Sequence, residues 1–178
     1  LTAVVVGTGL ASCAEFPSRG ETSSLSEEGS ANMDSHPTTE ADTKDLGLPT
    51  SAPLVGPEPG KSSIINLASG RKFILHMPAS YQPGKKWPVV LAFHGWKETA
   101  GMMEGYTEMD AAEAIMVYPY GKDGAWAPAP YAKTTGTEDI QFARDIVDSL
   151  RATYAVDDDR IFATGMSNGG GFAAYLGC

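Results

Sequence analysis

A serine between two glycines is the part of this sequence best suited to chemistry. Ser167 lies in Gly165-Met166-Ser167-Asn168-Gly169, between a short apolar run at 160–164 and a stretch of small residues at 170–174. A serine hydroxyl is a weak nucleophile until a base removes its proton, and a sharp strand-to-helix turn exposes the hydroxyl to base and substrate. The flanking glycines allow a backbone that a Cβ would obstruct. The pattern therefore predicts a nucleophilic serine, although a glycine-rich loop after an ordinary strand has the same letters.

The base that such a serine needs is not evident after it in the chain. When a serine occupies this kind of turn, the catalytic acid and then the histidine follow it in sequence. No residue after Ser167 is acidic or a histidine, and His36, His76 and His94 all precede it. We expect the acid and base to lie beyond Cys178, and the chain to be a fragment truncated at both ends and inactive alone. His94 as the base is the alternative, which chain order disfavours.

A second set of candidate groups follows the apolar run 88–93. His94-Gly95-Trp96 comes directly after it, and this run is typical of a strand buried on both faces. One oxyanion-hole amide comes from the residue after the nucleophile, here Asn168, and the other from the loop after such a strand. We expect the backbone of Gly95 and Trp96 to contribute, with His94 orienting the loop. Losing one donor typically costs about 3–4 kcal/mol of barrier.

The N-terminal residues predict export. Residues 1–12 are uncharged and mostly apolar, too short to span a bilayer as a helix, and of the length of a signal-peptide h-region whose basic n-region is missing. Leu10-Ala11-Ser12-Cys13 resembles a bacterial lipobox, in which the cysteine is lipidated. An ordinary signal peptide cleaved nearby, with Cys13 incidental, is the alternative. We assign residues 1–13 to this signal.

Residues 14–60 form a predicted disordered linker. Ser, Thr, Gly, Pro and acidic residues dominate it, and no apolar periodicity appears. It holds nine acidic residues against two basic ones, which accounts for seven of the nine net negative charges of the chain. Such a segment cannot bury enough apolar surface to offset its ordering entropy. We expect a tether between membrane and catalytic domain, in which His36 is inert.

Residues 61–178 read as an α/β domain with a mostly parallel sheet and flanking helices. Short apolar segments predict a hairpin, two buried strands and one amphipathic helix that begins after Thr137 as its N-cap. His76 alternates with apolar residues and is predicted on the sheet surface. Asp157-Asp158-Asp159 is interpreted as a solvated turn and not a metal site. The expected elements are strands at 64–67, 72–77, 88–93 and 115–118, and a helix at 138–154.

Residues 71–178 resemble the secreted esterase family that includes polyhydroxybutyrate depolymerases and feruloyl esterases, carbohydrate esterase family 1, and particularly its actinobacterial lipoproteins. The resemblance implies an α/β-hydrolase fold, here its N-terminal half, with Ser167 as nucleophile and an oxyanion hole around His94 and Gly95. It also places Trp126 near the substrate cleft, and a packing role for Trp126 is the alternative. The matching segments are Pro88–Gly95, Val117–Gly121, Trp126, Glu138–Phe142 and Asp159–Gly170.

These observations together predict a lipid-anchored serine esterase outside the cytoplasm that works through an acyl-enzyme without cofactor or metal. A serine peptidase of similar fold and a non-catalytic envelope lipoprotein are the alternatives. The ester could belong to a polyester, a feruloylated polysaccharide or a small acyl ester. The sequence has no basic patch with interleaved aromatic residues, so we do not expect nucleic acid as a partner. Neither the oligomeric state nor a disulfide at Cys178 follows from the sequence.

Lipidation of Cys13 can be tested directly. We expect Cys13→Ala to block lipid attachment and processing, because no other residue of the lipobox carries a thiol. The parent protein should partition into detergent and sediment with membranes, since several acyl chains hold a protein more firmly than one. An unmodified, freely secreted parent protein would exclude the lipobox.

Overall fold

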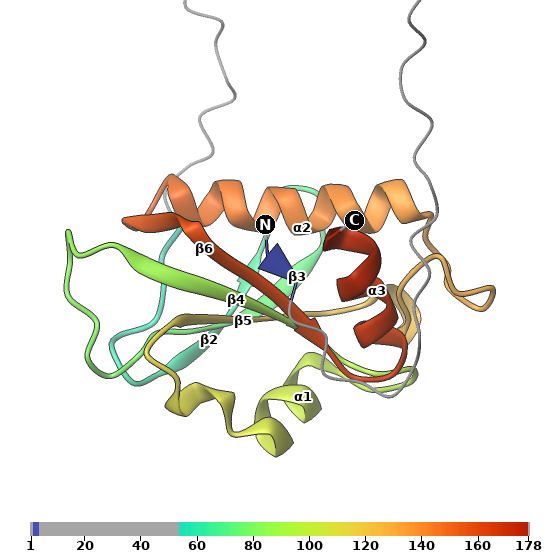
Figure 1. The fold of residues 1–178 in the computed structure, drawn as a ribbon, viewed down its shortest axis with the longest axis horizontal. Coiled ribbons are helices and arrows are strands. Elements are labelled where there is room, and N and C mark those ends of the chain that lie inside the picture. Colours follow the sequence, from blue (N-terminus) through green and yellow to red (C-terminus); the bar gives the residue numbers. More distant parts are fainter. Residues whose placement is uncertain (1, 4–53, 178) are drawn as a thin grey trace, which may run out of the picture. The chain divides into compact units, whose positions relative to one another are not determined.

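The structure, a computed structural model, describes residues 2–3 and 54–177, which build a mixed sheet with helices on both faces (Figure 1). The strand order is β1-β6-β4-β5-β3-β2. The strands are β1 (Thr2–Ala3), β2 (Ser62–Asn66), β3 (Lys72–His76), β4 (Trp87–Phe93), β5 (Ile115–Pro119) and β6 (Val156–Gly165).

The pairing of the strands confirms the predicted architecture. β2 and β3 form the predicted antiparallel hairpin, and β3 also pairs antiparallel with β5. β4 pairs parallel with both β5 and β6. Because the carboxyl ends of β4 and β6 lie at the same edge, the loop after β4 and the turn after β6 are brought together there.

Two residues at the start of the chain join the same sheet. Thr2 and Ala3 form β1, which pairs parallel with β6 at Phe162 and Ala163. The signal-peptide, lipobox and linker assignments fall almost wholly on residues 4–53, which lie outside the described residues, and they stay predictions. No helix in the described part of the chain is long and apolar enough to cross a membrane.

Helices cover the two faces of the sheet (Figure 1). On one face, α2 and α3 pack through side chains such as Ile146 and Phe172 onto Leu75 and Leu91. On the other face, α1 packs Met103 into a smaller cluster. The helices are α1 (Ala100–Thr107), α2 (Gly136–Arg151) and α3 (Asn168–Gly177), with short 3-10 turns η1 (Met109–Ala111) and η2 (Lys122–Gly124).

The start of α2 lies earlier than the sequence predicted. Thr135, and not Thr137, is the N-cap, and its side chain accepts a hydrogen bond from Glu138 N–H. The Glu138 side chain accepts in return from Thr135 N–H, which completes a capping box. The helix ends at Arg151 rather than at Tyr154.

Two other local predictions are wrong, and one helix was not predicted. The three aspartates at 157–159 belong to the long strand β6, where Arg160 and Arg151 pair with Asp157 and Asp158. His76 is only 8% exposed, because the face of β3 that carries it is covered by α1 and η1. Helix α1 itself was not predicted, since its mixed sequence has little amphipathic pattern.

Candidate active site

Ser167 occupies the turn between β6 and α3, as the motif predicts. Its φ is +52°, in the left-handed region that a residue with a side chain rarely adopts. Ser167 is exposed, while Gly165 and Gly169 on either side are buried. Backbone strain of this kind persists only where the surroundings enforce it, and it is concentrated at functional sites.

The two glycines of the motif are required by close backbone contacts. A Cβ on Gly165 would lie 2.4 Å from the carbonyl oxygen of Gly169. A Cβ on Gly169 would lie 2.2 Å from the carbonyl oxygen of Phe93 and 2.4 Å from that of His94. The first turn of α3 therefore rests directly on the end of β4. This contact sets Ser167 beside the loop that follows β4.

In the loop after β4, the backbone N–H groups of Gly95 and Lys97 are hydrogen-bonded, whereas that of Trp96 has no partner among the described residues. Gly95 N–H donates to Glu98 Oε2 at 2.8 Å, and Lys97 N–H donates to the Gly124 carbonyl, also at 2.8 Å. Trp96 N–H makes no hydrogen bond with any described residue, and the same holds for Asn168 N–H after the nucleophile. The available pair of amides is thus Trp96 and Asn168. The expectation that Gly95 N–H serves as an oxyanion donor is corrected, because Glu98 already accepts from it.

Glu98 is held in place by a tyrosine of α1. Tyr106 Oη donates to Glu98 Oε2 at 2.9 Å. Burial, together with the hydrogen bond to Glu98, raises the pKa of Tyr106 to about 12, so the phenol remains a donor at neutral pH. Tyr106 of α1 therefore helps to hold the loop after β4 in place through its hydrogen bond to Glu98. No sequence pattern had indicated Glu98 or Tyr106.

The His94 side chain is buried and bridges the loop after β4 and the loop after β5. Its Nε2 accepts from Gly121 N–H at 2.9 Å, which leaves the proton on Nδ1, 2.8 Å from the Gly95 carbonyl oxygen. Burial lowers the pKa of His94, with the Gly95 contact and the charge of Glu98 opposing it. The neutral ring thus has both nitrogens engaged by the backbone. This geometry fits a loop-orienting role and leaves no free nitrogen for a catalytic base.

Trp126 is fully buried, which favours the packing alternative over a place on the substrate cleft. Its ring packs edge-on to Phe93 and stacks on Phe172, and its indole N–H donates to the His94 carbonyl oxygen at 3.0 Å. Asn168 holds the Trp126 backbone from both sides. Trp126 N–H donates to Asn168 Oδ1 at 2.8 Å, and Asn168 Nδ2 donates to the Trp126 carbonyl at 2.9 Å.

A buried carboxylate fixes the segment that follows Trp126. Asp139, fully buried in the first turn of α2, accepts from Ala127 N–H, Thr134 Oγ1 and Arg71 Nη1. Arg71 also lies 3.9 Å above the ring of Phe142. In the sequence, Asp139 stands out only as part of the segment Glu138–Phe142 that matches the esterase family. Its role in tying the 126–134 loop to α2 and β3 was missed.

The remaining candidates lie elsewhere. Cys13, Cys178 and His36 are outside the described residues. The described part of the chain has one grouping of metal-ligating side chains, His76, Glu104 and Asp110, which shares no residue with the contacts around Ser167.

Comparison with known proteins identifies the family of this fold. A family model described as "Putative esterase" matches residues 65–178. The chain is 29% identical over 139 residues to feruloyl esterase C of Emericella nidulans, covering 71% of this chain and 48% of the relative. It is 30% identical over 116 residues to feruloyl esterase B of Piromyces equi, covering 61% and 21%. The chain thus spans less than half the length of these relatives.

A solved structure supports the same fold. The ferulic acid esterase of the anaerobic fungus Anaeromyces mucronatus superposes with a TM-score of 0.50 at 19% identity, covering 71% of this chain and 56% of that one. The likeness confirms the predicted α/β-hydrolase fold.

The buried His94 predicts a pH dependence of stability. Because burial lowers its pKa in the folded state, the unfolded chain binds more protons below the ordinary histidine pKa of about 6.5. The free energy of unfolding should therefore decrease as the pH is lowered from about 7 to about 5. Urea titrations should show a shallower fall in His94→Asn, which lacks the titrating group.

His36→Gln, in the predicted linker, is the matched control and should keep the parent's pH dependence. A parent protein whose stability is flat over this range, or a His94→Asn variant with the parent's slope, would contradict a buried neutral His94.

Proposed function

The chain belongs to the putative esterase family, and we propose that it is a serine esterase that hydrolyses carboxylic esters through an acyl-enzyme. One observation carries the proposal. Ser167 is exposed at a left-handed turn whose neighbouring backbone offers two amides, Trp96 and Asn168, without partners among the described residues. This is the arrangement that nucleophilic attack on an ester carbonyl requires.

In the proposed reaction, Ser167 Oγ attacks the carbonyl carbon while a base takes its proton. The carbonyl oxygen becomes an oxyanion, which accepts hydrogen bonds from Trp96 N–H and Asn168 N–H. The tetrahedral intermediate then breaks down to the acyl-enzyme, and the leaving alcohol receives the proton from the base. Water hydrolyses the acyl-enzyme by the same two steps. We place the base on a histidine outside residues 54–177, because His94 has both nitrogens engaged and His76 contacts Asp110 and Ser62.

The surface around Ser167 favours an aromatic acyl group. Trp96 and Tyr131 are 48% and 41% exposed, with ring centroids 4.6 Å apart. Met166, directly before the nucleophile, is 41% exposed. Trp96 and Tyr131 thus offer an exposed pair of aromatic rings, and an exposed apolar surface commonly marks a binding site. Two relatives are named feruloyl esterases, and we propose a hydroxycinnamoyl ester as the substrate class.

The place of action is proposed from the sequence alone. The apolar start of the chain and the lipobox at Cys13 support a lipid-anchored enzyme outside the cytoplasm, with residues 14–60 as its tether.

Ser167→Ala tests the proposed nucleophile. In the full-length protein we expect this substitution to lower hydrolysis of p-nitrophenyl acetate on the order of 10⁴- to 10⁶-fold, because no other group can form the acyl-enzyme. The melting temperature should stay close to that of the parent. Ser69→Ala, at an exposed turn, is the control and should keep full activity. Substantial turnover by Ser167→Ala would remove Ser167 from the mechanism.

Trp96→Ala tests the proposed acyl class. Its backbone amide is retained, so hydrolysis of p-nitrophenyl acetate should change little. KM for methyl ferulate should rise about two- to tenfold, the range expected for loss of one aromatic contact. Met102→Ala, an exposed apolar residue of α1, is the control. Equal effects of Trp96→Ala on both esters would argue against an aromatic acyl site.

A further inference from the structure

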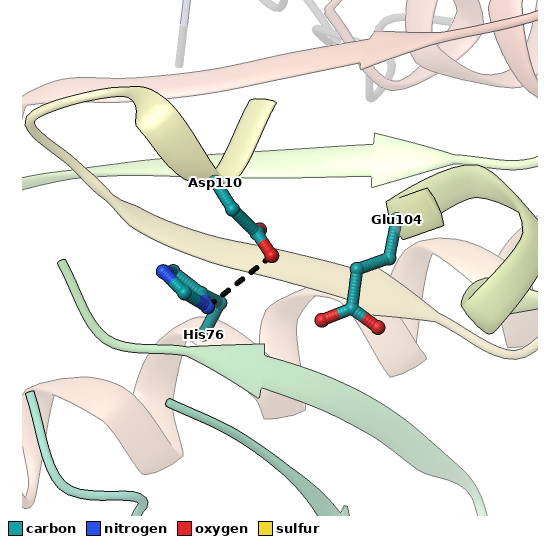
Figure 2. Close-up of side chains that lie close together, drawn as sticks. All are labelled: His76, Glu104 and Asp110. Carbon is teal, nitrogen blue, oxygen red and sulfur yellow. Dashed lines mark ion pairs between the residues drawn. The ribbon is translucent and has the colours of Figure 1, made fainter. Parts of the chain in front are cut away.

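We propose that His76, Glu104 and Asp110 form a zinc-binding site on the α1 side of the sheet. The three residues come from the end of β3, from α1 and from η1, and Figure 2 shows their side chains converging on one space. One ligand atom from each lies within 4.8 Å of the others. The inference does not depend on the proposed esterase activity.

The distances fit a small tetrahedral ion. Zn–N and Zn–O bonds of about 2.0–2.1 Å at tetrahedral angles place neighbouring ligand atoms about 3.3–3.4 Å apart. His76 Nδ1 lies 3.3 Å from Asp110 Oδ2, which matches that edge. Glu104 is half-buried, and its ligand atom lies within 4.8 Å of the other two. Three protein ligands leave one position for water.

The charges around the site call for a cation. Two carboxylates face each other across this space, and in the described part of the chain neither forms an ion pair with a lysine or arginine. A divalent ion would offset the negative charge of both carboxylates.

Surrounding groups already orient the ligands. Tyr118 Oη donates to Asp110 Oδ1 at 2.7 Å, which leaves Oδ2 for the ion. Ser62 Oγ lies 2.8 Å from His76 Nδ1, the atom proposed to bind the ion, so this hydrogen bond would be given up when the ion binds. His76 is 8% exposed and packed in place. An outer contact such as that of Tyr118 fixes the orientation of a metal ligand.

The mixture of ligands selects the metal. Imidazole suits zinc and its neighbours in the first transition row, whereas calcium and magnesium prefer all-oxygen sites. One histidine with two carboxylates is a set that zinc accepts. A zinc ion here would join β3, α1 and η1. Tyr106 of α1 hydrogen-bonds Glu98, which accepts from Gly95 N–H in the loop after β4. By fixing α1, the ion would also restrict the motion of this loop.

Calorimetric titration of the full-length protein with ZnCl₂, after removal of metal by EDTA, tests the site. We expect one saturable Zn²⁺ per chain, a melting temperature that rises with Zn²⁺, and a visible tetrahedral absorption when Co²⁺ replaces it. Glu104→Gln should weaken Zn²⁺ binding at least tenfold, and His76→Ala should abolish it. Because Glu104 is half-buried, Glu104→Gln provides the test even if His76→Ala fails to fold.

Glu108→Gln is the matched control, since Glu108 is an exposed acid between the two carboxylate ligands in sequence. It should bind Zn²⁺ like the parent. No saturable binding by the parent, or equal binding by the parent and Glu104→Gln, would overturn the proposal. So would Ca²⁺ or Mg²⁺ binding as tightly as Zn²⁺, because the site would then not have the selectivity of its histidine.

Discussion

The candidate active site depends on one backbone contact, the first turn of α3 against the end of β4. Gly169 approaches the Phe93 and His94 carbonyls so closely that a single added carbon would collide with both. This approach is possible only without a side chain, and it fixes where the chain turns after β6. Ser167 adopts a left-handed backbone conformation at this turn. Parallel pairing of β4 with β6 makes the contact possible, because it brings the carboxyl ends of both strands to the same edge.

Around this contact, buried polar groups connect three loops. Asn168 binds both backbone groups of Trp126, the Trp126 indole binds the His94 carbonyl, and the His94 ring bridges to Gly121. The bond from the Trp126 indole is buried and the other three are partly buried. A buried polar group left without its partner costs about 1–3 kcal/mol. These bonds tie the loops together, and the N–H groups of Trp96 and Asn168 are left without a hydrogen bond to any described residue. A preorganised pair of donors stabilises a developing oxyanion without reorganisation during the reaction.

The sequence predicted the parts of this structure that are encoded locally. Apolar runs located β4 and β5, and G-x-S-x-G located the turn at Ser167, because strands and turns leave short-range patterns. The N-cap of α2 was misplaced by two residues, since Thr135 and Thr137 are both acceptable caps. Contacts between distant segments left no such pattern. Engagement of Gly95 by Glu98, burial of Asp139 under Arg71, and the convergence of His76 with Glu104 and Asp110 depend on how elements pack.

The assignment of Ser167, Trp96 and Asn168 is tested most sharply by a crystal structure of the full-length protein after reaction with a fluorophosphonate ester. The phosphonyl group mimics the tetrahedral intermediate, so its oxygen reports which amides receive the negative charge. We expect a covalent bond from phosphorus to Ser167 Oγ, with the phosphonyl oxygen about 2.7–3.1 Å from the Trp96 and Asn168 amide nitrogens. Phosphorus attached to another residue, or an oxygen bound by Gly95 N–H after release of Glu98, would contradict it.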